Sequence, residues 1–100
     1  MWPVEWHDEA EEELAVATDW YAEQNVSAAV AFANEVRDAI LSIAVDPTRL
    51  PTLGPERHFY LLKRFPYLVV FRVLESVVQI MAVAHTSRRP GYWLHRDSGR

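Results

Sequence analysis

Two segments with helical spacing of apolar residues, separated by a very short break, constrain the fold of this chain most. The first places apolar side chains along one face at Ala10, Leu14, Ala17 and Tyr21. The second does so at Ala29, Phe32, Ala33, Val36, Ile40 and Ile43. Asn25 and Ser27 separate the segments, and Pro47 ends the second because proline cannot continue a helix. Helices joined by so short a connection pack side by side, so the pattern predicts an antiparallel helical hairpin.

The residues before each segment predict where the helices begin. Asp8 and Glu11 have the spacing of a capping box, in which two side chains bond to free backbone amides of the first turn. The acids that follow Asp8 also suit a helix N-terminus, which favours negative charge. Ser27 is placed to cap the second helix.

The rest of the chain has β-strand patterns. Trp2–Trp6 alternates in polarity, and Pro3 predicts that this strand lies at a sheet edge, because proline donates no ladder hydrogen bond. After a loop at 47–55, three β-rich runs follow at His58–Lys63, Tyr67–Leu74 and Val77–His85. Glu75-Ser76 is short enough for a two-residue hairpin turn. The last two runs carry apolar residues at both odd and even positions, so both faces of the sheet are apolar there. If the helices cover one face, the apolar row on the other is either an exposed partner surface or is covered within the chain.

Length, charge and cysteine content set further limits. One hundred residues fit a single domain spanning 1–100, with a basic, aromatic tail at 86–100. Residues 1–50 carry 11 acids and 2 bases, whereas residues 51–100 carry 3 acids and 8 bases. This split predicts either an acidic surface and a separate basic, anion-binding one, or merely two solvated faces.

Several classes of protein are disfavoured by what the sequence lacks. It has no cysteine, which excludes disulfides and thiolate chemistry. No apolar run approaches the roughly 20 residues that span a bilayer, and the first residues show no signal-peptide pattern. We therefore expect a cytoplasmic protein without a membrane partner.

The histidines and glycines give little support for a metal or cofactor. His7, His58, His85 and His95 show no metal-ligand spacing, and no glycine-rich phosphate loop is present. We expect neither a metal nor another cofactor.

Basic residues around the predicted strand ends are better candidates for binding or catalysis. They are Lys63, Arg64, Arg72, Arg88 and Arg89. Guanidinium groups bind phosphate oxygens in a fork geometry, so such a set could stabilise cleavage of a phosphodiester, with Tyr92 or His85 transferring protons. The alternative is that these residues are solvated strand ends.

The order of these segments resembles the RelE/ParE superfamily of bacterial type II toxin–antitoxin toxins. The stretch from His7 to Leu14 followed by Trp20-Tyr21 is similar to its opening helix, and Leu62–Val73 is similar to its central hairpin. Ala82–His85, followed by Arg88–Trp93, resembles its closing strand and tail. The resemblance covers roughly residues 4–96. It implies an α+β fold in which a helical hairpin packs on a mostly antiparallel four-stranded sheet, in the order β-α-α-β-β-β. It also implies a cognate antitoxin partner.

The two branches of the superfamily imply different targets. RelE-like toxins cleave messenger RNA on the ribosome, and by position that branch implies catalytic roles for Lys63, Arg64, Arg72, Arg88 and Tyr92. However, Thr86 stands where that branch tends to carry a functional basic residue.

The hairpin and the ending look closer to the ParE-like branch, which inhibits DNA gyrase without being an enzyme. That branch implies a target-binding surface formed by His85, Arg88, Arg89, Tyr92 and Trp93. We therefore expect a ParE-like toxin, with a ribosome-dependent endoribonuclease or a degenerate antitoxin-binding homologue as alternatives.

Overall fold

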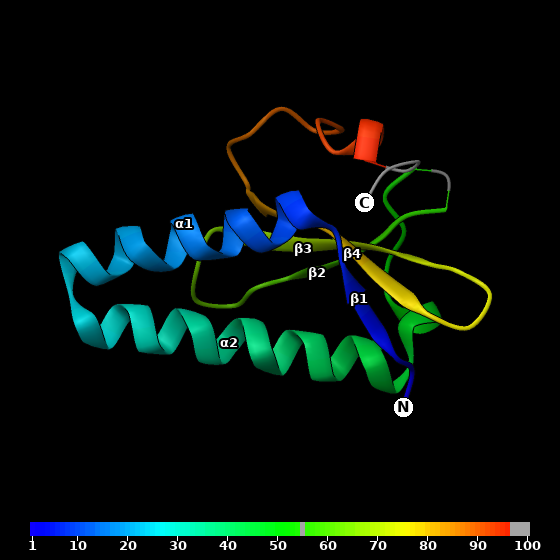
Figure 1. Cartoon of the computed structure of the whole chain (residues 1–100), viewed down its shortest axis with the longest axis horizontal. Coiled ribbons are helices and arrows are strands. Elements are labelled where there is room, and N and C mark those ends of the chain that lie inside the picture. Colours follow the sequence, from blue (N-terminus) through cyan, green and yellow to red (C-terminus); the bar gives the residue numbers. More distant parts are fainter. Residues whose placement is uncertain (55, 97–100) are drawn as a thin grey trace.

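The computed structural model describes residues 1–54 and 56–96 of the chain. Its helices and strands are β1 (Val4–Trp6), α1 (Asp8–Gln24), α2 (Val26–Val45), η1 (Pro47–Arg49), β2 (His58–Leu61), β3 (Tyr67–Val73), β4 (Val78–His85) and η2 (Leu94–Arg96) (Figure 1). This is the α+β order β-α-α-β-β-β that we expected. Pro55 in the predicted loop and residues 97–100 of the predicted tail lie outside the described residues.

The strands form one sheet in the order β1-β4-β3-β2. β3 pairs antiparallel with β2 and β4, whereas β1 runs parallel to β4. The sheet is therefore mostly antiparallel, as expected, and the first strand of the chain lies beside the last. β1 is an edge strand, where Pro3 costs no ladder bond, and the Pro3 carbonyl accepts the N–H of Val78 at 2.9 Å.

The strands are shorter than predicted. β1 begins two residues late because the N–H of Trp2 donates to the Ala44 carbonyl at the end of α2 instead of joining the sheet. β2 ends before Leu62, and the turn between β3 and β4 takes one residue from each predicted strand. The N–H of Leu74 donates to the Val77 carbonyl at 2.8 Å, which closes the expected tight turn around Glu75-Ser76.

The predicted capping box of α1 is wrong. The N-cap is His7, whose Nδ1 accepts the N–H of Glu9 at 3.1 Å, and Asp8 is already helical. The N–H of His7 donates to the Ile80 carbonyl at 2.9 Å. Because that bond ties His7 to β4, the helix starts one residue earlier than the side chain of Asp8 would require.

The predicted cap of α2 is also wrong, since Asn25 takes the place assigned to Ser27. The Oδ1 atom of Asn25 accepts the N–H groups of Ser27 at 2.7 Å and Ala28 at 3.3 Å. The N–H of Asn25 donates to the Tyr21 carbonyl at 2.8 Å. One extended residue therefore ends α1 and begins α2, and the two helices form the expected hairpin.

The main core lies between the helices and one face of the sheet. From the predicted stripes, Ala10, Ala17, Ala29, Phe32, Val36 and Ile43 are buried, whereas Ala33 is exposed. Of these, Ala10, Ala17, Phe32, Val36 and Ile43 share one core cluster with Val69, Phe71, Val78, Ile80 and Val83 of β3 and β4. Within the described residues, no helix is long and apolar enough to cross a membrane.

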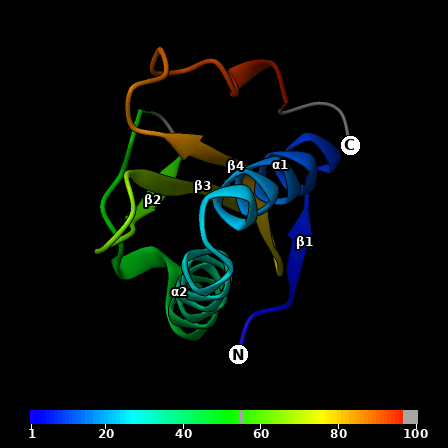
Figure 2. The same ribbon diagram turned by 90° about the vertical axis from the view of Figure 1, so that its left-hand side faces the viewer.

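The other face of the sheet is covered by the chain itself. The apolar row there comprises Val70, Met81, Ala82 and Ala84. Trp93 of the tail is buried on it, and Tyr92 and Leu53 pack against its margin. Figure 2 shows the sheet between α2 on one side and the tail on the other. The sequence left open whether this row is an exposed partner surface or is covered within the chain, and the structure shows that it is covered.

Candidate functional site

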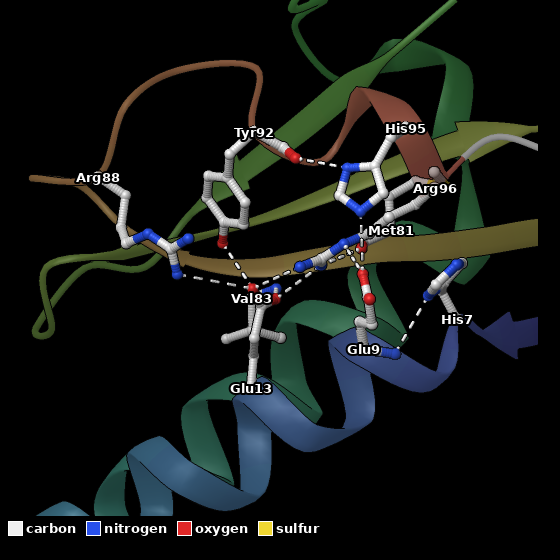
Figure 3. A network of polar contacts seen from close by, with 9 residues as sticks. All are labelled: His7, Glu9, Glu13, Met81, Val83, Arg88, Tyr92, His95 and Arg96. Atoms are coloured by element: carbon white, nitrogen blue, oxygen red, sulfur yellow. Dashed lines mark hydrogen bonds and ion pairs between the residues drawn. The ribbon is translucent and has the colours of Figure 1, made fainter.

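The tail is fastened to α1 by a network of polar contacts centred on Glu13 (Figure 3). The Glu13 carboxylate accepts the hydroxyl of Tyr92 at 2.8 Å and two guanidinium nitrogens of Arg96 at 3.1 and 3.0 Å. It also accepts the backbone N–H of Val83 at 2.9 Å. β1 pairs with β4 only over Val78–Ile80. Further along β4, the carboxylate of Glu13 takes the place of a neighbouring strand and accepts the N–H of Val83. One carboxylate thus joins helix, sheet and tail.

Arg96 is the buried cation of this network, with 7% of its side chain exposed. Its Nε atom lies 2.7 Å from the carboxylate of Glu9, and its Nη1 atom donates to the Met81 carbonyl at 2.9 Å. Burial lowers the pKa of Arg96, but the hydrogen bond and the charges of Glu13 and Glu9 outweigh this effect and raise it. The acidic start of α1 therefore compensates a buried arginine of the basic half.

Tyr92 is held as a hydrogen-bond donor. Burial, and then the hydrogen bond to Glu13 and the charge of that carboxylate, raise the pKa of Tyr92 far above its ordinary value. The Arg88 guanidinium lies 3.8 Å from the centre of the Tyr92 ring, a cation–π contact, and 4.0 Å from the Glu13 carboxylate. A proton-transfer role for Tyr92 requires its hydroxyl to leave Glu13.

Lys63 and Arg64 lie in the loop between β2 and β3. Glu35 of α2 accepts the backbone N–H groups of both, and its carboxylate is 3.7 Å from the Nε atom of Arg64. Both side chains are exposed, that of Arg64 by 68%. The N–H of Thr86 donates to the Pro66 carbonyl at 2.9 Å, which fixes this loop beside the segment that follows β4.

Four cations therefore gather at one end of the sheet, a surface we call the basic end: Lys63, Arg64, Arg88 and Arg89. Arg89 is exposed, and 53% of the Arg88 side chain is exposed. His85 lies at the same end, opposite Tyr67 in the register, and its Nδ1 atom accepts the N–H of Ser87 at 3.1 Å.

Arg72 is not part of the basic end. It pairs with Gln79, and its Nε atom donates to Oε1 of that residue at 2.8 Å. This pair lies five positions along β3 from Tyr67, or roughly 17 Å at about 3.4 Å per residue. The structure thus separates Arg72 from Lys63 and Arg64, and the five residues of the nuclease hypothesis do not converge.

Trp93, assigned to the target-binding surface by the sequence, is 4% exposed. Its ring is part of the second core, so among the five residues of that surface, His85, Arg88 and Arg89 are the ones with side chains available near the basic end. Among the described residues, no group of three acidic, histidine or cysteine side chains could hold a metal ion.

An apolar groove opens beside the basic end, between α1 and the adjoining ends of β3 and β4. Its volume is about 630 Å³. We call it the α1 groove, and its main lining residues are Val16, Trp20, Tyr67, Val83, His85 and Arg88. Sequence reasoning missed this groove, and it also missed Glu13, Glu35 and Arg96. The signal that could have found these three residues is the opposite charge of the two halves of the chain. Glu13 and Glu35 of the acidic half pair with Arg96 and Arg64 of the basic half.

The fold and the site define a small α+β domain in which the contacts of Glu13 with Tyr92 and Arg96, which we call the clamp, hold the tail. The basic end and the α1 groove face solvent. Residues 4–90 match the family model described as the ParE toxin of the type II toxin–antitoxin system parDE. The chain belongs to this family of type II toxins and is ParE-like.

A solved structure described as the chromosomal ParDE toxin–antitoxin system from P. aeruginosa has the same fold. It is 19% identical, with a TM-score of 0.76, and the match covers 87% of this chain and 98% of that one. The chain matches no curated protein sequence.

Proposed function

We propose that this toxin stops growth by binding DNA gyrase through its basic end, and that a cognate antitoxin neutralises it in the cytoplasm. The observation that carries the proposal is the gathering of Lys63, Arg64, Arg88 and Arg89 at one end of the sheet. Exposed cations that share one surface favour association with an acidic partner. Membership of the ParE family supports gyrase as that partner and an antitoxin as the inhibitor.

The positions of the nuclease candidates favour binding over catalysis. A phosphoryl-transfer site needs its cations and its proton carrier around one scissile phosphate. Here Arg72 lies at the far end of β3, and the hydroxyl of Tyr92 is engaged with Glu13. In the proposed function, the basic residues contact the target protein and perform no chemistry.

A supercoiling assay with purified gyrase tests the proposal. The toxin is expected to inhibit supercoiling, and Arg88→Ala combined with Arg89→Ala should raise the half-inhibitory concentration at least tenfold. Arg37→Ala with Arg49→Ala, which removes two exposed arginines from α2 and η1, is the matched control and should leave inhibition unchanged. Both double variants should keep the melting temperature within a few degrees, because exposed charges contribute little to stability.

Any of three results would refute the proposal. Unchanged supercoiling at a large molar excess of toxin would exclude gyrase. Cleavage of messenger RNA on programmed ribosomes would identify an endoribonuclease. Normal growth of cells that express the chain without its antitoxin would identify a degenerate, antitoxin-binding homologue.

A further inference from the structure

The second helix, α2, carries apolar residues on two sides. One side, which includes Phe32, Val36 and Ile43, is buried in the main core. The other side presents four large apolar side chains that are 49–70% exposed: Val26, Val30, Leu41 and Val45. We call this side the α2 face, and Figure 2 shows α2 at the outer edge of the molecule. A helix that is apolar on both sides is normally covered on both, so the α2 face is suited to a partner.

The apolar residues of the α2 face have the same spacing when the helix is read from either end. Val26 and Val30 are four residues apart, and so are Leu41 and Val45. The two pairs are also equally far from the middle of α2. If two copies of α2 pack antiparallel about their middles, Val30 of each copy faces Leu41 of the other, and Val26 faces Val45. A two-fold axis requires this self-complementarity, because each contact across it occurs twice with the residues exchanged.

The charges beside the α2 face are also self-complementary. Arg37 and Asp38 are the exposed charged residues of α2, and neither forms an ion pair with the described residues 1–54 and 56–96. Because their charges are opposite, the face meets a copy of itself without net repulsion. In the antiparallel arrangement, Asp38 of the second copy lies four residues along the helix axis from Arg37. This is about 6 Å, a distance that the long arginine side chain can bridge.

A groove of about 330 Å³ adjoins the α2 face, between α1 and α2. Its lining is mostly apolar and includes Trp6 and Leu14 together with Arg37 and Leu41. Since Arg37 and Leu41 belong both to the groove and to the exposed side of α2, the surface offered to a partner is concave there. Apolar side chains of a second α2 can enter it.

We propose that the α2 face is a dimer interface, on which a second copy of this chain packs its own α2 in the antiparallel direction. The dimer leaves the basic end open. Glu35, which accepts the N–H groups of Lys63 and Arg64, is five residues from Val30 and therefore about 140° away around the helix. The inference is thus independent of the target proposed above, and changes on the α2 face should leave gyrase inhibition unchanged.

Sedimentation equilibrium of the purified full chain at increasing concentration tests the interface. The unmodified chain is expected to form a reversible dimer, and Val30→Ser with Leu41→Ser should raise its dissociation constant at least tenfold. Val16→Ser with Trp20→Ser, which changes two exposed apolar residues of α1, is the matched control and should alter the constant by less than twofold. All these positions are exposed, so the circular dichroism spectra should stay native.

A charge exchange tests the antiparallel arrangement. Arg37→Asp or Asp38→Arg alone places like charges opposite each other and should weaken the dimer. The two changes together restore opposite charges across the axis and should recover it. Neighbours in sequence do not face each other on a helix, so a role of the two residues within one chain would not give this recovery.

Disulfide cross-linking tests the register, because the chain has no cysteine of its own. Chains with Val30→Cys, mixed with chains that carry Leu41→Cys, should form a covalent dimer on oxidation. Neither variant should link to itself. In the proposed register the two Val30 positions are eleven residues apart along the axis, about 16 Å, which is beyond the reach of a disulfide.

Four results would overturn the inference. They are a chain that stays monomeric at its highest soluble concentration, a dimer that Val30→Ser with Leu41→Ser does not weaken, efficient linking of Val30→Cys to itself, and no recovery in the charge exchange. A monomeric toxin whose α2 variants instead lose affinity for the protein encoded beside it would assign the face to the antitoxin and would also overturn the dimer.

Discussion

Replacing Glu13 with alanine should destabilise the domain more than replacing any exposed acid of α1. Its carboxylate serves three different segments: the backbone of Val83, the hydroxyl of Tyr92 and the guanidinium of Arg96. The substitution leaves the N–H of Val83 without this acceptor and removes one of the two carboxylates that face Arg96. Buried polar groups that lose a partner retain their desolvation cost.

The size of the effect follows from the burial of the two charges. Removing one partner of a buried ion pair costs about 3–5 kcal/mol. Glu13 keeps 17% of its side chain exposed, and Arg96 keeps Glu9 at 2.7 Å, so we expect the lower range of about 2–4 kcal/mol. For a domain of this length, the melting temperature should fall by roughly 10–30 °C.

The assay is urea unfolding followed by tryptophan fluorescence, with calorimetric melting as a second probe. Glu12→Ala is the control, because Glu12 is a neighbouring exposed acid, and its effect should stay within about 0.5 kcal/mol. A double-mutant cycle with Tyr92→Phe should give a coupling energy of about 1–3 kcal/mol. A loss below about 1 kcal/mol for Glu13→Ala, or strict additivity with Tyr92→Phe, would refute the clamp.

Three further predictions concern the helices and the tail. Since the pKa of Tyr92 is raised above its ordinary value of 10, the stability that Tyr92 contributes is complete below pH 10 and lost above it. When the absorbance of the four tyrosines is followed as the pH is raised, the component that ionises last should be missing in Tyr92→Phe. An unchanged titration curve would contradict this. Val36→Asp places an unpaired carboxylate in the core at a position 2% exposed, so circular dichroism should show an unfolded chain, and a native melting curve would refute that placement. Asn25→Ala removes the cap of α2 and should cost about 1 kcal/mol in urea unfolding, where no change would mean that Asn25 does not cap the helix.

The apolar pattern predicted the elements of the fold because helix and strand periods are local properties. Phe32, Val36 and Ile43 recur at helical spacing and face the core as expected. The helix starts were predicted less well. Asp8 and Ser27 are suitable capping residues, but His7 is tied to β4 through the Ile80 carbonyl, and Asn25 can end one helix while beginning the next. Competing caps differ little in free energy, so the bond of His7 to β4 decides the cap of α1, and the local bond of Asn25 to the Tyr21 carbonyl at the end of α1 decides that of α2.

The candidate site was predicted in part. Basic residues around the strand ends were identified from sequence, and the register then placed Arg88 and Arg89 near Lys63 and Arg64 but left Arg72 at the opposite end. Sequence alone could not make this distinction, because all five positions lie in or beside β-rich runs. The register of β3 against β4 decides which ends meet, and hairpin geometry sets that register.

By itself, the sequence determined a helical hairpin, three β-rich runs after it and opposite charges in its two halves, since each depends on residues close together in the chain. The tertiary structure decided how those charges are used. Glu13 and Arg96 are far apart in sequence, yet they meet beside β4 and hold the tail over the second apolar face. Acids of the same helix that point outward, such as Glu12, stay exposed next to Trp20. A difference of one residue along a helix turns a side chain by about 100°, so which acid is buried and which faces solvent depends on how the helix packs.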